Sequence, residues 1–108
     1  MARDNLGDFE GRVLLTLLRL GEDAYSAPIV RELEARTGRE VAVAAVYIAL
    51  RRLEERGLVR SELRDPGGAG GRDRRHFVLT AGGRERLREA HRMYTTLCEG
   101  LGPLLEDT

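Results

Sequence analysis

The chain has 108 residues with 42% apolar side chains and no net charge, which is typical of one soluble globular domain. No apolar run approaches the roughly 18 residues of a membrane span, and the first residues do not resemble a signal peptide. We therefore expect a cytoplasmic protein with no membrane partner. Cys98 is the only cysteine, so an intrachain disulfide is excluded, while a free thiol and an intermolecular bond both stay open.

Charge is unevenly distributed along the chain. Residues 51–92 contain twelve arginines and seven acids, an excess of +5, and the remainder contains six arginines and eleven acids, an excess of −5. A basic middle section between acidic flanks makes the charge distribution asymmetric, so that a basic region can bind phosphates although the chain has no net charge. All eighteen cations are arginine, which we attribute to codon usage in a GC-rich genome rather than to selection for bidentate phosphate contacts.

Two amphipathic helices are predicted in the first part of the chain. Residues 9–20 carry apolar side chains at helical spacing, and Gly21 ends the segment. The second helix is expected to begin at Ser26 as its N-cap and to end at Gly38. A short turn, roughly residues 37–41, then leads into a third helix, as a helix-turn-helix requires.

The third helix ends at Gly57 and has one predicted core face. Its core positions recur at i, i+3, i+7 and i+10, at Val43, Val46, Leu50 and Leu53. A strand is expected over residues 58–63 and a return strand from Arg74 to Leu79, and the glycine-rich residues 65–71 between them predict a mobile loop.

Thr80 is predicted to cap a last helix that carries a long apolar stripe. The stripe consists of Leu87, Ala90, His91, Tyr94, Leu97, Cys98 and Leu101. Nothing remains in a chain of this length to cover it, so we expect a helix from a second copy to do so. The fold class is therefore mainly α with a small β-hairpin: a winged helix-turn-helix domain at residues 1–80 and a C-terminal dimerisation helix at residues 81–108.

This order of elements is how a winged helix presents one helix to a DNA major groove and a hairpin to the backbone beside it. The outward face of the third helix is predicted to hold Ala42, Ala44, Ala45, Ile48, Arg51 and Arg52. Small residues allow close approach to base edges, Ala or Ile can touch a thymine methyl, and the arginines can reach phosphate or guanine. The alternative is an ordinary solvated helix face.

Further DNA-binding candidates lie around that helix. Tyr47 is either a core residue or a phosphate ligand at the rim. Arg72, Arg74 and Arg75 flank the glycine loop and fit a wing that contacts the DNA backbone, or else they keep a hairpin in solution. Ser26 lies at a helix N-terminus, which attracts phosphate, although its capping role would be needed in any case.

Catalytic and metal chemistry find little support in the sequence. It contains no recognisable nucleophile motif, phosphate-binding loop or pair of carboxylates in an apolar setting, so we expect no enzyme activity and no cofactor. His91 and Cys98 are seven residues apart and share a helix face, but a closed metal site usually needs four ligands. We therefore interpret them as interface residues and expect no metal.

Three segments carry a resemblance to a known family. GEDAYSAPIVRELEARTG at 21–38, VYIALRRLEERGLVRSEL at 46–63 and RRHFVLTAGG at 74–83 resemble the PadR-like transcriptional regulators, which are winged helix-turn-helix repressors. The resemblance covers roughly residues 12–90. It implies a homodimer held by the first and last helices, with Phe9 and Val13 contributing from the first, and a response to small aromatic or multidrug-like compounds.

The sequence departs from that family at two points. The family usually has Ser or Thr near position 42 and Gly or Ser at position 44, where this chain has Ala42 and Ala44; the change removes a helix cap and polar DNA contacts. Members that sandwich flat drugs often use tryptophan, and this chain has none, which argues against a pocket of that kind.

The functional hypothesis is a homodimeric, ligand-responsive repressor that binds double-stranded operator DNA. One alternative is a winged helix that uses the apolar face of its third helix on a protein partner. The other is a redox or metal sensor acting through His91 and Cys98.

Overall fold

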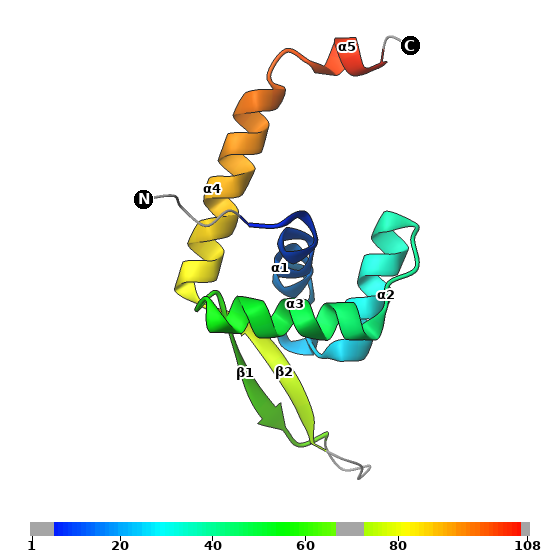
Figure 1. The fold of residues 1–108 in the computed structure, drawn as a ribbon, viewed down its shortest axis with the longest axis vertical. Helices are drawn as coiled ribbons and strands as arrows, with labels where there is room; N and C mark the ends of the chain where they lie inside the picture. The colour runs from blue at the N-terminus through cyan, green and yellow to red at the C-terminus, as the bar shows by residue number, and fades with distance from the viewer. Residues whose placement is uncertain (1–5, 67–72, 107–108) are drawn as a thin grey trace.

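The protein, in a computed structural model that describes residues 6–66 and 73–106, is mainly helical with one antiparallel hairpin. The elements in chain order are α1 (Asp8–Leu20), the 3-10 helix η1 (Gly21–Asp23), α2 (Ser26–Thr37), α3 (Val43–Glu55), β1 (Val59–Arg64), β2 (Arg74–Leu79), α4 (Ala81–Cys98) and α5 (Gly102–Glu106). Helices α1, α2 and α3 gather in the body of the molecule, while the hairpin and α4 extend from it in opposite directions (Figure 1). The predicted fold class, mainly helical with a small β-hairpin, is confirmed, and the elements up to α4 follow in the predicted order. The dimerisation role of the C-terminal helix stays a prediction.

An apolar core lies between the three helices and the base of the hairpin. Its most deeply buried side chains are Val13, Leu14, Ile29, Val46, Leu50, Leu53 and Val59. Phe77 of β2 and Leu87 of α4 join the same cluster. Each such burial stabilises the fold by about 1.5–3 kcal/mol, so the amphipathic periodicity of the sequence is what assembles the domain.

The outcome for Val13 differs from the sequence prediction. Its side chain is 0% exposed within one chain, so it has no surface to offer to a partner and is a core residue, not a dimer contact. Phe9 is half-buried and packs against the core cluster, which leaves part of its ring accessible.

Glycines end the first two helices as predicted. Gly21 and Gly38 take φ values of 58° and 70°, a conformation that costs glycine little and other residues more. The predicted cap of α2 is wrong. Tyr25 occupies the N-cap position, Ser26 is the first helical residue, and no side chain caps this end. Thr80 does cap α4, because its hydroxyl accepts a hydrogen bond from Gly83 N at 3.0 Å.

The core face of α3 is shifted from the predicted one. Val46, Leu50 and Leu53 are buried as expected, but Val43 is 59% exposed. Val43 is the first residue of the helix and lies about 60° around its axis from Val46 by helical geometry, at the edge of the buried face. Ala49 fills the core face instead.

The hairpin pairs Val59 with Leu79 at its base and Arg64 with Arg74 at its far end. The first strand begins one residue later than predicted, and the return strand has the predicted bounds. Residues 67–71 of the predicted mobile loop, and the candidate Arg72, lie outside the described residues.

The C-terminal segment is two helices rather than one. Helix α4 ends at Cys98, Gly100 turns the chain with φ 78°, and α5 begins at Gly102. Leu101 therefore lies in the turn and not on the predicted helical stripe. Cys98 is a half-buried free thiol. Among the helices of residues 6–66 and 73–106, none combines the length and apolar character that crossing a bilayer requires.

Candidate nucleic-acid interface

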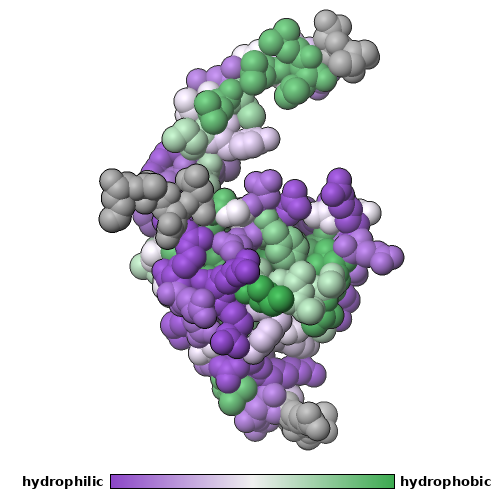
Figure 2. Space-filling view, in the orientation of Figure 1, coloured by the Kyte–Doolittle hydropathy of each residue, from purple (hydrophilic) through white to green (hydrophobic). Residues whose placement is uncertain are grey.

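The outward face of α3 has the composition that the sequence predicted. Ala42, Ala44, Ala45, Tyr47, Ile48, Arg51 and Arg52 are all exposed. Ile48 is 51% exposed, far more than an isoleucine that contributes to a core. Over α3, Figure 2 shows apolar surface on the half nearer α2 and hydrophilic surface on the half that leads into the hairpin.

Tyr47 belongs to this surface and not to the core. It is 46% exposed, and the guanidinium carbon of Arg51 lies 5.8 Å from the centre of its ring. A hydrogen bond to Tyr47 raises the pKa of Arg51 above its ordinary value. The two side chains, one helical turn apart, hold each other in place and present a hydroxyl and a cation beside the apolar residues.

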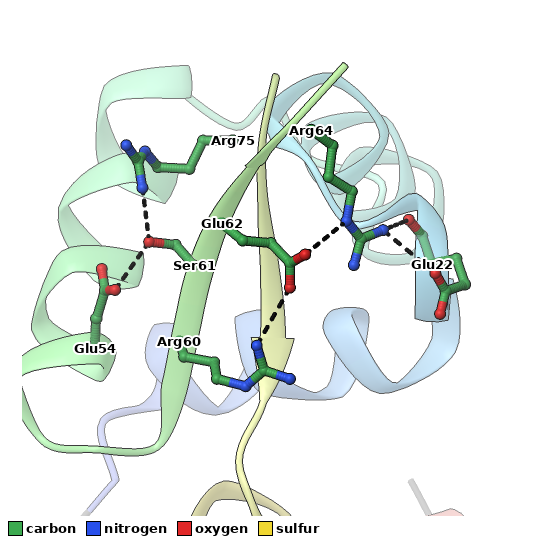
Figure 3. A network of polar contacts seen from close by, with 7 residues as sticks. All are labelled: Glu22, Glu54, Arg60, Ser61, Glu62, Arg64 and Arg75. Atoms are coloured by element: carbon green, nitrogen blue, oxygen red, sulfur yellow. Dashed lines mark hydrogen bonds and ion pairs between the residues drawn. The ribbon is translucent and has the colours of Figure 1, made fainter. Parts of the chain in front are cut away.

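The hairpin reaches α3 through a polar chain on one of its faces. Ser61 Oγ donates to Glu54 Oε2 of α3 at 2.9 Å and accepts from Arg75 Nη1 at 3.0 Å. Figure 3 shows Arg75, Ser61 and Glu54 together on one side of β1. Arg75 is thereby held on the side of the hairpin that adjoins α3.

The opposite side of β1 carries an ion-pair network. Glu62 bonds Arg60 at 3.2 Å and Arg64 at 3.3 Å, and Arg64 also bonds Glu22 before α2 at 3.3 Å (Figure 3). The hydrogen bond from Arg64 is the main reason why the pKa of Glu62 lies below its ordinary value. Two cations and two carboxylates offset one another here, so this network itself offers little net charge to phosphate.

Arg74 is held by an aromatic residue. Its Nη1 donates to Tyr25 Oη at 3.0 Å, and its guanidinium carbon lies 4.6 Å from the centre of the Tyr25 ring. The Tyr25 ring also lies 5.1 Å from the ring of His76. A backbone bond from Phe77 N to Ala24 O at 2.9 Å runs alongside. The start of α2 and the second strand of the wing are therefore joined at this point.

Two residues of this arrangement were missed by the sequence analysis. Tyr25 precedes α2 and Ser61 lies in β1, and the sequence pattern assigns neither of them a contact with the wing arginines. Only the strand register and the approach of β2 to residue 24 reveal their roles. Ser26, predicted to meet phosphate at a helix N-terminus, lies half-buried beside Tyr25, and no contact in the structure distinguishes it further.

The predicted dimer residues do not form a ligand site. His91 is exposed and Cys98 is half-buried on α4. No cluster of three or more His, Cys, Asp and Glu side chains suited to a metal ion occurs within residues 6–66 and 73–106. The structure therefore brings the two residues near no further ligand in that part of the chain.

The model of the Transcriptional regulator PadR-like family matches residues 14–89 of this sequence. The chain belongs to the PadR-like family. A PadR-family regulator from Eggerthella lenta is 36% identical over 89% of this chain and 82% of its own, with a TM-score of 0.66. None of the curated proteins matches the sequence significantly.

More distant solved structures share the fold. A PadR-like regulator from Bacillus cereus has a TM-score of 0.76 at 21% identity over 93% of both chains. A protein from STIV described as a winged-helix DNA-binding protein has a TM-score of 0.70 at 16% identity, over 90% of this chain and 98% of its own. This PadR-like chain is thus a DNA-binding transcriptional regulator with a winged-helix fold, and not an enzyme.

Proposed function

We propose that this PadR-like protein is a homodimeric repressor whose α3 enters the major groove while Arg75 and Arg74 of the wing meet the DNA backbone. The observation that carries the proposal is the outward face of α3, where small and apolar residues in the first turns are followed by Arg51 and Arg52. Small side chains allow the helix to approach base edges, and arginines further along can reach phosphate or guanine.

The proposed mode of action is repression. The residues singled out here offer a helix for DNA and an apolar surface for a partner, and the family is regulatory and not enzymatic. A regulator of this kind can repress by occupying its operator, because a protein bound across a promoter excludes the polymerase.

The second half of α4 supports the homodimer. Leu87 is buried against the body, but every residue from Ala90 to Leu97 is exposed. Tyr94 and Leu97 are 72% and 67% exposed. By helical geometry Tyr94 lies on the same side of the helix as Leu87, so the face that contacts the core continues uncovered beyond it. A second α4 would cover this apolar face and place two α3 helices on one duplex.

Effector response, which the family resemblance implies, is proposed to use the same region. A shallow groove of about 410 Å³ lies between Leu6 and α4 and is lined by Ala90, Met93, Tyr94 and Leu97 among others. A small apolar compound bound there would alter the packing of two α4 helices and thereby the spacing of the two DNA-binding helices. Thermal-shift measurements with such compounds should show stabilisation of the wild-type protein that the Met93→Arg variant lacks.

The decisive experiment for DNA binding is the salt dependence of the affinity for the DNA upstream of the protein's own gene. Neutralising Z phosphates gives a slope of log K against log salt of about −0.9Z. We expect a steep slope and at least a hundredfold preference over a random duplex of equal length. A protein-interaction module that uses the apolar face of α3 would instead show weak binding to both duplexes.

A further inference from the structure

The first two turns of α3 present almost no side chain that can form a hydrogen bond to a base. Val43, Ala44, Ala45 and Ile48 are exposed and end in methyl groups. Tyr47 carries the only hydroxyl in these turns, and the guanidinium of Arg51 lies over its ring. The part of the helix with the smallest side chains, which can approach the bases most closely, is therefore apolar.

The apolar residues are centred on the exposed face and are not at its margin. Ala44, Ile48 and Arg51 follow at i, i+4 and i+7, so they form one line along the helix. That line lies opposite the buried line formed by Val46 and Leu53. A groove that accepts the outward face of α3 meets Ala44 and Ile48 first.

Charge indicates which end of α3 lies deepest in the groove. Glu55, at the C-terminal end of the same face, is exposed, and a carboxylate there would be repelled by phosphate. Arg51 and Arg52 lie between it and the apolar turns. The N-terminal half of α3 is therefore the part that meets bases, with the arginines bridging toward the backbone.

Base chemistry then selects one nucleotide. In the major groove guanine and adenine present acceptors, cytosine and adenine present amino donors, and thymine presents a methyl group beside one acceptor. An apolar side chain pressed against a donor or an acceptor removes its water and offers no hydrogen bond in return, which is unfavourable. Against the thymine methyl the same side chain gains apolar contact.

We propose that Ala44 and Ile48 select thymine in each half of the operator by contact with its C5 methyl group. The inference rests on the proposed function, since it assumes that α3 lies in the major groove. It goes beyond that function by naming the base that is recognised and the two residues that recognise it.

The test uses a duplex selected by the wild-type protein from a random double-stranded library. Each thymine of that duplex is replaced singly by deoxyuridine, which removes only the methyl group. Affinity is measured by fluorescence anisotropy at one fixed salt concentration. Losing one buried methyl should weaken binding about fourfold, at one or two positions per half-site, with less than twofold effects elsewhere.

Two variants locate the contact. Ile48→Ala should weaken binding to the thymine duplex and reduce the uracil effect to below twofold at its position, because the partner of the methyl group is then gone. Ile48 is exposed, so circular dichroism should show an unchanged fold. Arg75→Ala is the control: it should weaken binding to both duplexes and leave the fourfold ratio intact.

The possible outcomes separate the two claims. Specific binding without a uracil effect above twofold at any position overturns thymine selection and leaves the proposed function standing. Uracil effects that persist fully at every sensitive thymine in Ile48→Ala overturn the assignment to this residue. If the library yields no preferred duplex, the proposed function fails, and thymine selection fails with it.

Discussion

Consecutive residues of a β-strand point to opposite faces of the sheet, and this separates the two arginines of the wing. Arg75 bonds Ser61, which in turn bonds Glu54 of α3. Arg74 bonds Tyr25 before α2. The sequence places both arginines beside a glycine-rich loop and treats them alike, because it does not specify which strand residues lie opposite one another. Only the register reveals that Arg75 shares the side of α3.

The two arginines should therefore differ when each is changed alone. Arg75→Ala should make the negative slope of log K against log salt shallower by about one unit for each half-site, since one phosphate contact is lost there. Arg74→Ala should have the smaller effect on the slope, because Arg74 lies on the side of the hairpin away from Arg75 and Ser61. Anisotropy titrations at several salt concentrations measure both. Identical slopes for the two variants would contradict the division of the hairpin into two sides.

The ion pairs of Glu62 lead to a second prediction for a single residue, on how thermal stability depends on pH. The pKa of Glu62 is lowered in the folded chain. The ionised Glu62 carboxylate therefore stabilises the fold above the pKa of the unfolded chain, and this stabilisation is lost as pH falls through the pKa of the folded chain. Below that value the bonds to Arg60 and Arg64 weaken. Glu62→Gln should remove this part of the pH dependence of thermal stability in the acid range. A variant whose acid profile matches the wild type would show that the network does not contribute.

At the scale of elements, the sequence predicted what depends on local pattern. Helical periodicity and the glycine stops gave the order of the elements, and the exposed composition of α3 was correct. Some of the errors involve interactions across elements, and others involve local backbone conformation. Val43 fits the periodicity, but it lies at the edge of the face that α1 and α2 cover. The last helix breaks near Gly100, which has a positive φ. The sequence contains several glycines and does not show which of them adopts this conformation.

The junction of α3, β1 and α4 depends on a glycine that the sequence analysis did not single out. Thr80 N donates to Leu58 O at 3.1 Å, and Gly83 packs so closely that an added Cβ would lie 2.0 Å from the same oxygen. The backbone of α4 therefore packs directly against Leu58, in the segment that joins α3 to β1. This contact sets the direction in which α4 leaves the body of the molecule (Figure 1).

Gly83→Ala should consequently destabilise the fold by about 1–3 kcal/mol or more, the usual cost of overpacking. Its neighbour supplies a matched control. A Cβ at Gly82 would meet nothing closer than 3.6 Å, so Gly82→Ala should leave stability unchanged or raise it slightly. Urea unfolding of both variants measures the difference. Equal midpoints would mean that α4 can move away from Leu58 without loss.

At the scale of the whole molecule, the excess positive charge of residues 51–92 is only partly available to DNA. Arg56 pairs with Glu10, and Arg88 and Arg92 pair with Glu85. The arginines of α3 and the wing are therefore the ones that we expect to contact phosphate. A monomer that meets DNA with so few cations would bind weakly, and two such surfaces on one duplex would double the number of contacts.

The molecule measures 53 Å along its longest axis, and exposed apolar side chains occupy its α4 and α5 end. Leu105 of α5 is 71% exposed, comparable with Tyr94 and Leu97 of α4, so exposure alone does not say which helix meets a second copy. Position favours α4. Its apolar face continues from the core at Leu87, whereas α5 follows the turn at Gly100 and is only five residues long.

Leu97→Arg should therefore give a monomer at micromolar concentration, because the introduced charge would be buried without a partner in the α4 interface. Leu105→Arg is the matched control and should remain dimeric.

A chain ending after Arg88 keeps Leu87 in the core and should also be monomeric. It should show little specific DNA binding, since a protein that binds one half-site gains operator affinity only when a second one is held about one helical turn away. Light scattering gives the masses. The α4 interface would be excluded if the intact protein were monomeric at this concentration, or if Leu105→Arg were monomeric while Leu97→Arg stayed dimeric. The two-fold arrangement of α3 on the operator would then be excluded as well.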